Sequence, residues 1–356
     1  MAQVNSSLTA TQPQRKKTVV FAIIFILITI IGLSYVKWYP YYNKSILAIT
    51  THSIGTSILG EQADMPSVSW DSAWSYALAY FNAVWKAAVF GIILGSLVQV
   101  LIPTNWLLKV LGKTSFGSTA VAGLASLPGM MCTCCAAPIA VGLRKKNVSV
   151  GASLAFWIGN PTLNPATLIF MTFVLSWKFT ALRLVFGLIL TFGISYLANR
   201  FAPRANPADL EKMIEKTETK AKGSFVSRWM KSIGNMILYI VPTYILAVLV
   251  MGAVRVWLFP QLSDAASNSL IAVIGFAIAG MLFVIPTAAE IPIIQTFMSF
   301  GLGGGPAGAL LLALPSISLP SLLLVAKSYP KKVLFFVAGS VVVLSILSGI
   351  AGMFLL

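Results

Sequence analysis

Long apolar stretches constrain this chain more than any other feature of its sequence. A helix needs about 20 apolar residues to cross a bilayer, and runs of that kind recur through the 356 residues. The runs occupy residues 18–36, 78–102, 117–143, 148–176, 179–199, 233–259, 268–300 and 305–356. Hydrophobic residues make up 58% of the chain and charged residues only 10%, which is too few to cover a soluble core of this size. The sequence therefore predicts an all-α, polytopic integral membrane protein surrounded by a lipid bilayer.

Membrane topology accounts for the net charge of +16. Basic residues gather in the predicted loops at 15–17, 109–113, 144–146, 200–231 and 327–332. If these loops are all cytoplasmic, the chain obeys the positive-inside rule. No folded basic domain is evident, so we expect no nucleic-acid partner. The first apolar run is too long for a signal peptide and no A-x-A cleavage site follows it, which predicts a cytoplasmic N-terminus in a bacterial inner membrane.

The apolar runs also repeat. A shift of 154 residues places "TCCAAPIAVG", from Thr133, on "TAAEIPIIQT", from Thr287. The helix breakers align in order, although two apolar segments can also match by chance. The predicted domains are a first helix at 1–36, an external segment at 37–73, membrane repeats at 74–199 and 233–356, and a cytoplasmic linker at 200–232. The helices before the two matching segments should run in opposite directions, which predicts the inverted-topology repeat of many secondary transporters.

All three cysteines of the chain lie in "LPGMMCTCCAAP", residues 127–138. Because the flanks on both sides are basic, we expect a re-entrant hairpin that enters and leaves on the cytoplasmic side, broken at Pro128 and Gly129. Thiolates are soft ligands, so Cys132, Cys134 and Cys135 could converge on a soft metal or metalloid. They could instead exchange with a disulfide, or simply pack as small apolar residues.

One carboxylate lies inside a predicted membrane segment. Glu290 follows the second half's matching break, whereas the other eight acidic residues fall in predicted loops. A carboxylate at that depth marks a functional site by default, and we expect Glu290 to couple transport to protons. The alternatives are that it caps a half-helix or pairs with a basic residue such as Lys86. Lys86, Lys178, Arg183 and Arg255 are expected to snorkel to the membrane interface.

Two further segments contain paired breaks. "GNPTLNPATL" places Asn160 and Asn164 before prolines, and its partner in the second half is "LPSISLPS". Broken helices free backbone carbonyls that can bind a solute, although two simple kinks would give the same pattern. The residues expected to line a solute path are Cys132, Thr133, Cys134, Cys135, Asn160, Asn164, Thr287, Ser316 and Ser318. The residues expected to break helices are Pro128, Gly129, Pro138, Pro161, Pro165, Pro286, Pro292, Pro315 and Pro320.

Together, "SLPGMMCTCCAAPIAVGLRKK", "AFWIGNPTLNPATLIFM" and "LFVIPTAAEIPIIQT" resemble the ArsP/YraQ-type family of predicted bacterial permeases, closest to its YraQ-like branch. The resemblance implies an inner-membrane permease. Some ArsP-like members export trivalent methylated arsenicals, with a cysteine pair in this hairpin proposed to bind arsenic. That role would pass to Cys132, Cys134 and Cys135.

These observations predict a secondary transporter, not an enzyme, that exports a small thiophilic solute such as a trivalent organoarsenical or a soft metal species. No cofactor is expected, and no G-x-x-x-x-G-K-[ST] motif is present to bind a nucleotide. The alternatives are a membrane thiol–disulfide oxidoreductase, an importer of a small sulfur- or metal-containing solute, or a metal sensor. The sequence leaves the direction of transport, the coupling ion and the oligomeric state open.

Overall fold

The computed structural model describes residues 12–59, 70–102, 104–202, 224–258 and 269–356, and every regular element in these ranges is a helix. Helices that are long and apolar enough to cross a membrane span Val20–Thr51, Ala73–Leu101, Trp177–Phe201, Phe225–Val254, Gly304–Val325 and Lys331–Leu355. The prediction of an all-helical membrane protein is confirmed. Large apolar side chains such as Ile271, Phe335 and Phe354 cover the outside of the bundle, where lipid would surround them.

The first helical element is longer than the sequence suggested. Helix α1 (Gln12–Leu33) continues through a π-helical turn (Ser34–Trp38) into α2 (Tyr39–Thr51). Residues 37–51, which the sequence placed in an external segment, therefore continue this helix. Helix α3 (Trp70–Leu101) begins within the expected external segment as well, with Asp71 in its first turn. Most of the linker expected at 200–232 lies outside the described residues.

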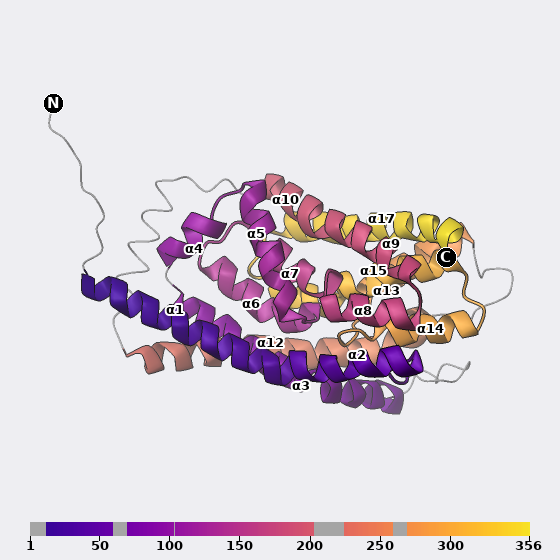
Figure 1. Cartoon of the computed structure of the whole chain (residues 1–356), viewed down its shortest axis with the longest axis horizontal. Helices are drawn as coiled ribbons and strands as arrows, with labels where there is room; N and C mark the ends of the chain where they lie inside the picture. Colours follow the sequence, from indigo (N-terminus) through magenta and orange to yellow (C-terminus); the bar gives the residue numbers. More distant parts are fainter. Residues whose placement is uncertain (1–11, 60–69, 103, 203–223, 259–268) are drawn as a thin grey trace.

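Each half of the chain contains a pair of short helices that is separated by a break. Helix α4 (Thr104–Leu111) leads to α5 (Phe116–Ser126), a 3₁₀ turn (Leu127–Gly129) and α6 (Thr133–Lys145). In the second half, α13 (Leu270–Leu282) and α14 (Glu290–Ser299) flank a non-helical segment. Figure 1 shows α5 and α6 toward the end where α1 begins, and α13 and α14 toward the opposite end.

The remaining helices complete two similar halves. The first half contains α7 (Val150–Thr162), α8 (Pro165–Val174) and α9 (Trp177–Leu188), the last continued by short turns to Phe201. The second half contains α15 (Gly304–Ser316), α16 (Leu319–Val325) and α17 (Lys331–Leu355). Between the halves, α12 (Phe225–Leu258) packs against α3. The bundle therefore places long helices around short, broken ones.

Helix starts recur at one spacing in the two halves. Helices α7 and α15 start 154 residues apart (304 − 150) and also end 154 residues apart (316 − 162). The starts of α5 and α13, of α8 and α16, and of α9 and α17 show the same difference (270 − 116, 319 − 165 and 331 − 177). This spacing matches the sequence shift that aligned the helix breakers.

Close backbone packing fixes α6 beside α3. A Cβ on Gly91 would lie 2.2 Å from the carbonyl oxygen of Cys135, and one on Gly95 would lie 2.4 Å from that of Pro138. Glycine at these two positions is therefore required, as in other membrane helix pairs that pack through small residues. The contact determines where the cysteine segment lies within the bundle.

Candidate functional site

Breaks from both halves of the chain meet around one small cavity. Its walls come from the start of α6, the end of α7, the segment before α14 and the break between α15 and α16. The lining residues are Cys132, Thr133, Pro161, Ile285, Pro286, Thr287, Ala288, Glu290, Leu314, Pro315 and Ser318. The space open to the centre of a water molecule is about 10 Å³, which is room for one water. The cavity is therefore closed around a very small volume in this conformation.

The break between α7 and α8 is built from Asn-Pro chemistry. Pro161 lies in the last turn of α7, and Pro165 opens α8, where proline is well tolerated. Asn164 is the N-cap of α8, and its Oδ1 accepts hydrogen bonds from the backbone N–H groups of Ala166 (3.1 Å) and Thr167 (3.3 Å). Two Asn-Pro steps thus end one helix and start the next inside the bundle.

The matching break in the second half uses serine. Helix α15 ends at Ser316 just after Pro315, and Ser318 caps α16 ahead of Pro320. Ser318 and Ser321 form a reciprocal capping box, in which each side chain accepts from the backbone N–H of the other. Ser316 instead donates to the carbonyl of Leu312, 2.5 Å away. Ser318 therefore faces the cavity while Ser316 satisfies its own helix.

The other expected helix breakers divide into two groups. Pro128 and Gly129 form the 3₁₀ turn after α5, and Pro286 lies in the non-helical segment before α14. Pro138, by contrast, lies inside α6 without ending it, and Pro292 lies in the first turn of α14. The expectation that these last two prolines break helices is wrong. A first-turn proline removes no helical hydrogen bond, and the close contact with α3 supports α6 around Pro138.

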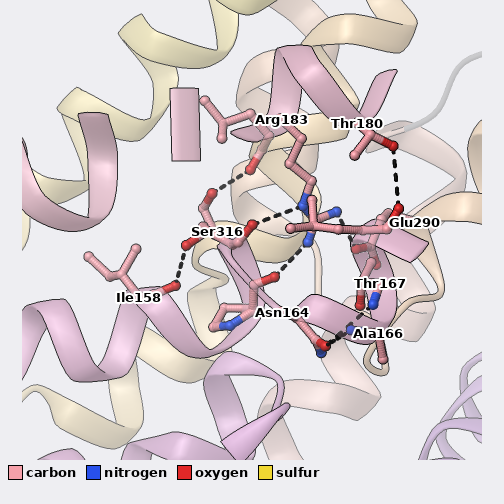
Figure 2. A network of polar contacts seen from close by, with 12 residues as sticks. Ile158, Asn164, Ala166, Thr167, Thr180, Arg183, Glu290 and Ser316 are labelled. Atoms are coloured by element: carbon pink, nitrogen blue, oxygen red, sulfur yellow. Dashed lines mark hydrogen bonds and ion pairs between the residues drawn. The ribbon is translucent and has the colours of Figure 1, made fainter. Parts of the chain in front are cut away.

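A buried ion pair lies beside the cavity. Arg183 Nη1 donates to Glu290 Oε1 at 2.5 Å, and both side chains are 1% exposed. The same guanidinium donates to the carbonyls of Pro161 (2.6 Å) and Thr162 (3.1 Å) at the end of α7. Figure 2 shows Arg183 and Glu290 within the polar network around this broken helix. Arg183 thus connects the last carbonyls of α7, in the first half of the chain, to the Glu290 carboxylate in the second half.

This pairing corrects two expectations. Arg183 does not snorkel to an interface, and Glu290 does not pair with Lys86, which is exposed. Helix α9 packs against α7 and α15, so Arg183, midway along α9, reaches the freed carbonyls at the end of α7. Lys178 is exposed as expected, and the side chain of Arg255 lies outside the described residues.

Several buried polar atoms at the breaks have no partner within the described residues: Glu290 Oε2, Asn160 Oδ1, Asn164 Nδ2 and Thr167 Oγ1. Of these residues Glu290 lines the cavity, whereas Asn160, Asn164 and Thr167 lie at or next to the break between α7 and α8 and are not among its lining residues. An unmade hydrogen bond at a buried polar atom costs about 1–3 kcal/mol. Gly129 lets the Asn160 side chain approach the backbone closely, because a Cβ on residue 129 would lie 2.2 Å from Asn160 Oδ1. The site therefore offers hydrogen-bonding capacity that its own side chains leave unused.

The cysteines do not share one centre. Cys132 is the N-cap of α6 and Cys135 lies one turn on, so their sulfurs face each other at 2.9 Å. Cys134 points elsewhere, with its Sγ 3.8 Å from Ser318 Oγ. In the described ranges, no three His, Cys, Asp or Glu side chains are arranged to hold a metal ion. The expected convergence of three sulfurs is wrong, because consecutive helical residues project in different directions.

Lys37 is a site residue that the sequence reasoning missed. It projects inward from the π-helical turn, is only 6% exposed, and donates to Tyr41 OH (3.0 Å) and Thr287 Oγ1 (3.1 Å). Its charge lies close enough to Cys132 and Cys135 to act on both thiols. The available signal is a single lysine among the aromatic residues of "KWYPYY", at the start of the segment that the sequence predicts to be external.

Buried tyrosines surround the third cysteine, and the sequence reasoning missed them too. Tyr80 on α3 and Tyr244 on α12 are hydrogen-bonded through their hydroxyls at 2.7 Å. Both tyrosine hydroxyls lie within reach of the Cys134 thiol. Thr133 contributes its backbone, because its carbonyl accepts a hydrogen bond from the fully buried Trp157 at 2.8 Å. Cys134 therefore lies among the hydroxyls of Ser318, Tyr80 and Tyr244, at the wall of an otherwise apolar cavity and separate from the pair formed by Cys132 and Cys135.

A bundle of this kind, with helices broken around a central polar cavity, has the architecture of a membrane permease. The chain belongs to the ArsP-type family described as predicted permeases, whose model matches residues 69–354. It is 52% identical over 326 residues to UPF0718 protein YraQ of Escherichia coli (strain K12), covering 92% of this chain and 93% of that protein.

A more distant relative is UPF0718 protein MJ0584 of Methanocaldococcus jannaschii, which is 22% identical over 323 residues, covering 72% of this chain and 88% of that protein. No solved structure matches the chain.

Proposed function

We propose that this permease is a secondary transporter that moves a small thiophilic solute out of the cytoplasm across a bacterial inner membrane. The observation that carries this proposal is the cavity shared by Cys132 from the first half and Glu290 from the second. Non-helical backbone at membrane depth is tolerated where it is buried in protein or lines a polar cavity. Four such breaks converge here, as in transporters that bind solute between repeats.

The proposed topology is an inverted repeat with a cytoplasmic N-terminus. The recurring spacing of helix starts supports two related halves. The opposite placement of the α5–α6 and α13–α14 pairs in Figure 1 supports their inversion. Under this proposal each pair is a re-entrant hairpin, one entered from the cytoplasm and the other from outside.

Each site residue has a proposed role. Cys132 and Cys135 bind the soft atom of the solute, since their sulfurs face each other. Thr287 and Ser318, which line the cavity, bind its polar groups. The free amide atoms of Asn160 and Asn164, at the neighbouring break, bind the waters that accompany it. The backbone of Thr133 shapes the wall beside Cys132.

Glu290 has the proposed role of coupling residue. Glu290 lines the cavity, one of its oxygens pairs with Arg183, and the other has no partner among the residues that the structure describes. Binding a proton or solute at Oε2 would weaken the pairing that connects the two halves. A small change at the site would thereby alter how α9 and α14 are held together.

The solute class we propose is a trivalent methylated arsenical, which offers two positions for thiolate exchange and so suits a pair of cysteines. The test is whole-cell accumulation of methylarsenite with and without the protein. We expect lower accumulation with the wild type, loss of that effect in Cys132→Ser and Cys135→Ser, and at most a partial loss in Cys134→Ser. Equal accumulation with and without the protein would rule out arsenical export.

A second candidate function is membrane thiol–disulfide exchange. Cys132 and Cys135 have C-x-x-C spacing at a helix N-terminus beside Lys37, which is a typical setting for reactive cysteines. Exchange would oxidise this pair to a disulfide while reducing a partner disulfide to two thiols. Alkylation followed by mass measurement, after treatment with oxidised or reduced dithiothreitol, distinguishes the two functions. A thiol pair that never cycles would exclude exchange.

A further inference from the structure

A second, larger cavity adjoins the site and has an unusual charge. It holds about 660 Å³ and lies between the α1–α2 element, α3 and the segment before α14. Three lysines line it: Lys37, Lys44 and Lys86. Among the described residues that line it, none is an aspartate or glutamate. We call this cavity the lysine vestibule.

Lys37 is the informative member of this group. Lys44 and Lys86 are exposed, so water can solvate their charges. Lys37 is buried, and its hydrogen-bond partners are the neutral hydroxyls of Tyr41 and Thr287. The one ion pair found within the described ranges is that of Arg183 with Glu290. A buried ammonium group without a carboxylate is expensive, and a bound anion would offset that cost.

Lys37 also lies where the vestibule meets the small cavity. Pro286, Thr287 and Ala288 line both cavities, so this short segment separates them. Thr287 bonds to Lys37 on one side and contacts Cys132 on the other. Ala288 has a positive φ of 69°, a strained conformation for a residue with a side chain. The segment that separates the two cavities is therefore short, and its backbone is strained at Ala288.

The start of α6 adds a second feature that favours an anion. Cys132 is the N-cap residue of α6, so its thiol lies at the N-terminus of this helix. The backbone N–H groups of the first turn carry partial positive charge. A solute at Cys132 would therefore meet the N-terminus of α6 and the Lys37 ammonium group together.

We propose that the transported solute is a small anion carrying a soft atom, which passes through the lysine vestibule and pairs with Lys37 while its soft atom faces Cys132 and Cys135. This inference rests on the proposed transport function, keeps its thiophilic solute class, and selects a charged solute in place of the uncharged arsenical. Thiosulfate is a suitable probe, because it combines two negative charges with a terminal sulfur atom. Sulfate has the same charge without the soft atom, and methylarsenite is a thiophilic probe without the charge.

The first experiment measures thermal stability of the purified full-length protein against each probe, since a ligand that binds the folded form raises its apparent stability. We expect thiosulfate to stabilise the wild type more than sulfate does. Lys37→Met should weaken thiosulfate binding about tenfold or more, whereas Lys37→Arg should largely retain it. Lys178→Met, an exposed lysine outside both cavities, is the matched control and should bind as the wild type does.

Two outcomes overturn the inference. One is that thiosulfate stabilises the protein no more than sulfate does, and the other is that Lys37→Met binds it normally. If Lys37→Met does not fold, the Lys44→Met/Lys86→Met double variant replaces it. Its affinity for thiosulfate should fall, and wild-type binding should weaken as salt is added. Unchanged affinity in that variant would equally reject the inference.

A separate assay isolates the underlying proposal. Methylarsenite flux into proteoliposomes tests transport of a thiophilic solute without reference to charge. Flux that is normal in Lys37→Met, together with no thiosulfate binding, would reject the anion while leaving the transporter intact. Absence of flux for both methylarsenite and thiosulfate would reject the transporter itself.

Discussion

At the scale of single residues, two buried cations define the centre of the molecule. Arg183 neutralises Glu290 and binds the end of α7, whereas the hydrogen-bond partners of Lys37 in the described part of the chain are hydroxyls. This difference suggests distinct roles, because a paired charge can hold structure together while an unpaired one can hold a solute. The two residues come from α9 and the α1–α2 element, far apart in the chain.

Removing Arg183 should destabilise the protein strongly. Arg183→Met leaves the Glu290 carboxylate buried without its partner, and breaking a buried pair in this way typically costs about 3–5 kcal/mol. The double variant Arg183→Met/Glu290→Gln should recover part of the loss, because no uncompensated charge remains. Thermal unfolding in detergent measures both, with the exposed Arg200→Met as control. Similar stability of Arg183→Met and the control would refute the structural role.

The strained backbone at Ala288 gives a second prediction. A left-handed conformation costs a non-glycine residue about 1–2 kcal/mol, so Ala288→Gly should keep or raise the melting temperature. Ala136→Gly, inside α6, should lower it, since glycine costs a helix interior about 1 kcal/mol. Differential scanning fluorimetry compares the two. Equal destabilisation by both changes would show that Ala288 is not strained.

At the scale of elements, the sequence predicted the positions of helix breaks better than the side-chain contacts between helices. The Asn160-Pro161 and Asn164-Pro165 steps predict where α7 ends and α8 begins, because proline lacks an N–H and asparagine caps a helix. The partner of Glu290 could not be predicted in this way. Arg183 is 107 residues away in sequence, and only the packing of α9 brings it near.

Lys37 was missed for a similar reason. The Lys37 side chain points inward from a π-helical turn, and no local pattern in the sequence predicts such a turn. The three-sulfur centre was expected because C-x-C-C places the thiols close in sequence. Helical geometry then paired Cys132 with Cys135 and turned Cys134 toward Ser318.

The contact between α3 and α6 gives an element-scale prediction. Gly91→Leu would force a side chain into the backbone of Cys135, so it should destabilise the protein by at least the 1–3 kcal/mol typical of overpacking. Gly275→Leu, on α13, meets no atom within 4 Å of its Cβ and is the matched control. Thermal unfolding of the two variants should differ clearly. Comparable stability would show that the helices need not approach so closely.

At the scale of the whole molecule, the proposed inversion of the two halves can be tested by labelling. In a Cys132→Ser/Cys134→Ser/Cys135→Ser background, Lys113→Cys and Lys145→Cys should react with a membrane-impermeant maleimide from the cytoplasmic side. Ser269→Cys and Ser299→Cys should react from outside. These positions flank the two pairs of short helices. Labelling of Lys113→Cys and Lys145→Cys from opposite sides would contradict the re-entrant hairpin and show that this segment crosses the membrane.

The whole account depends on a solute touching both halves of the chain in one closed pocket. The most direct measurement is alkylation of each cysteine, resolved by mass spectrometry, with and without methylarsenite, in the wild type and in Glu290→Gln. We predict that solute protects Cys132 and Cys135 more than Cys134, and that Glu290→Gln weakens this protection. Protection of Cys134 alone, or protection that Glu290→Gln leaves unchanged, would contradict a site built from both halves.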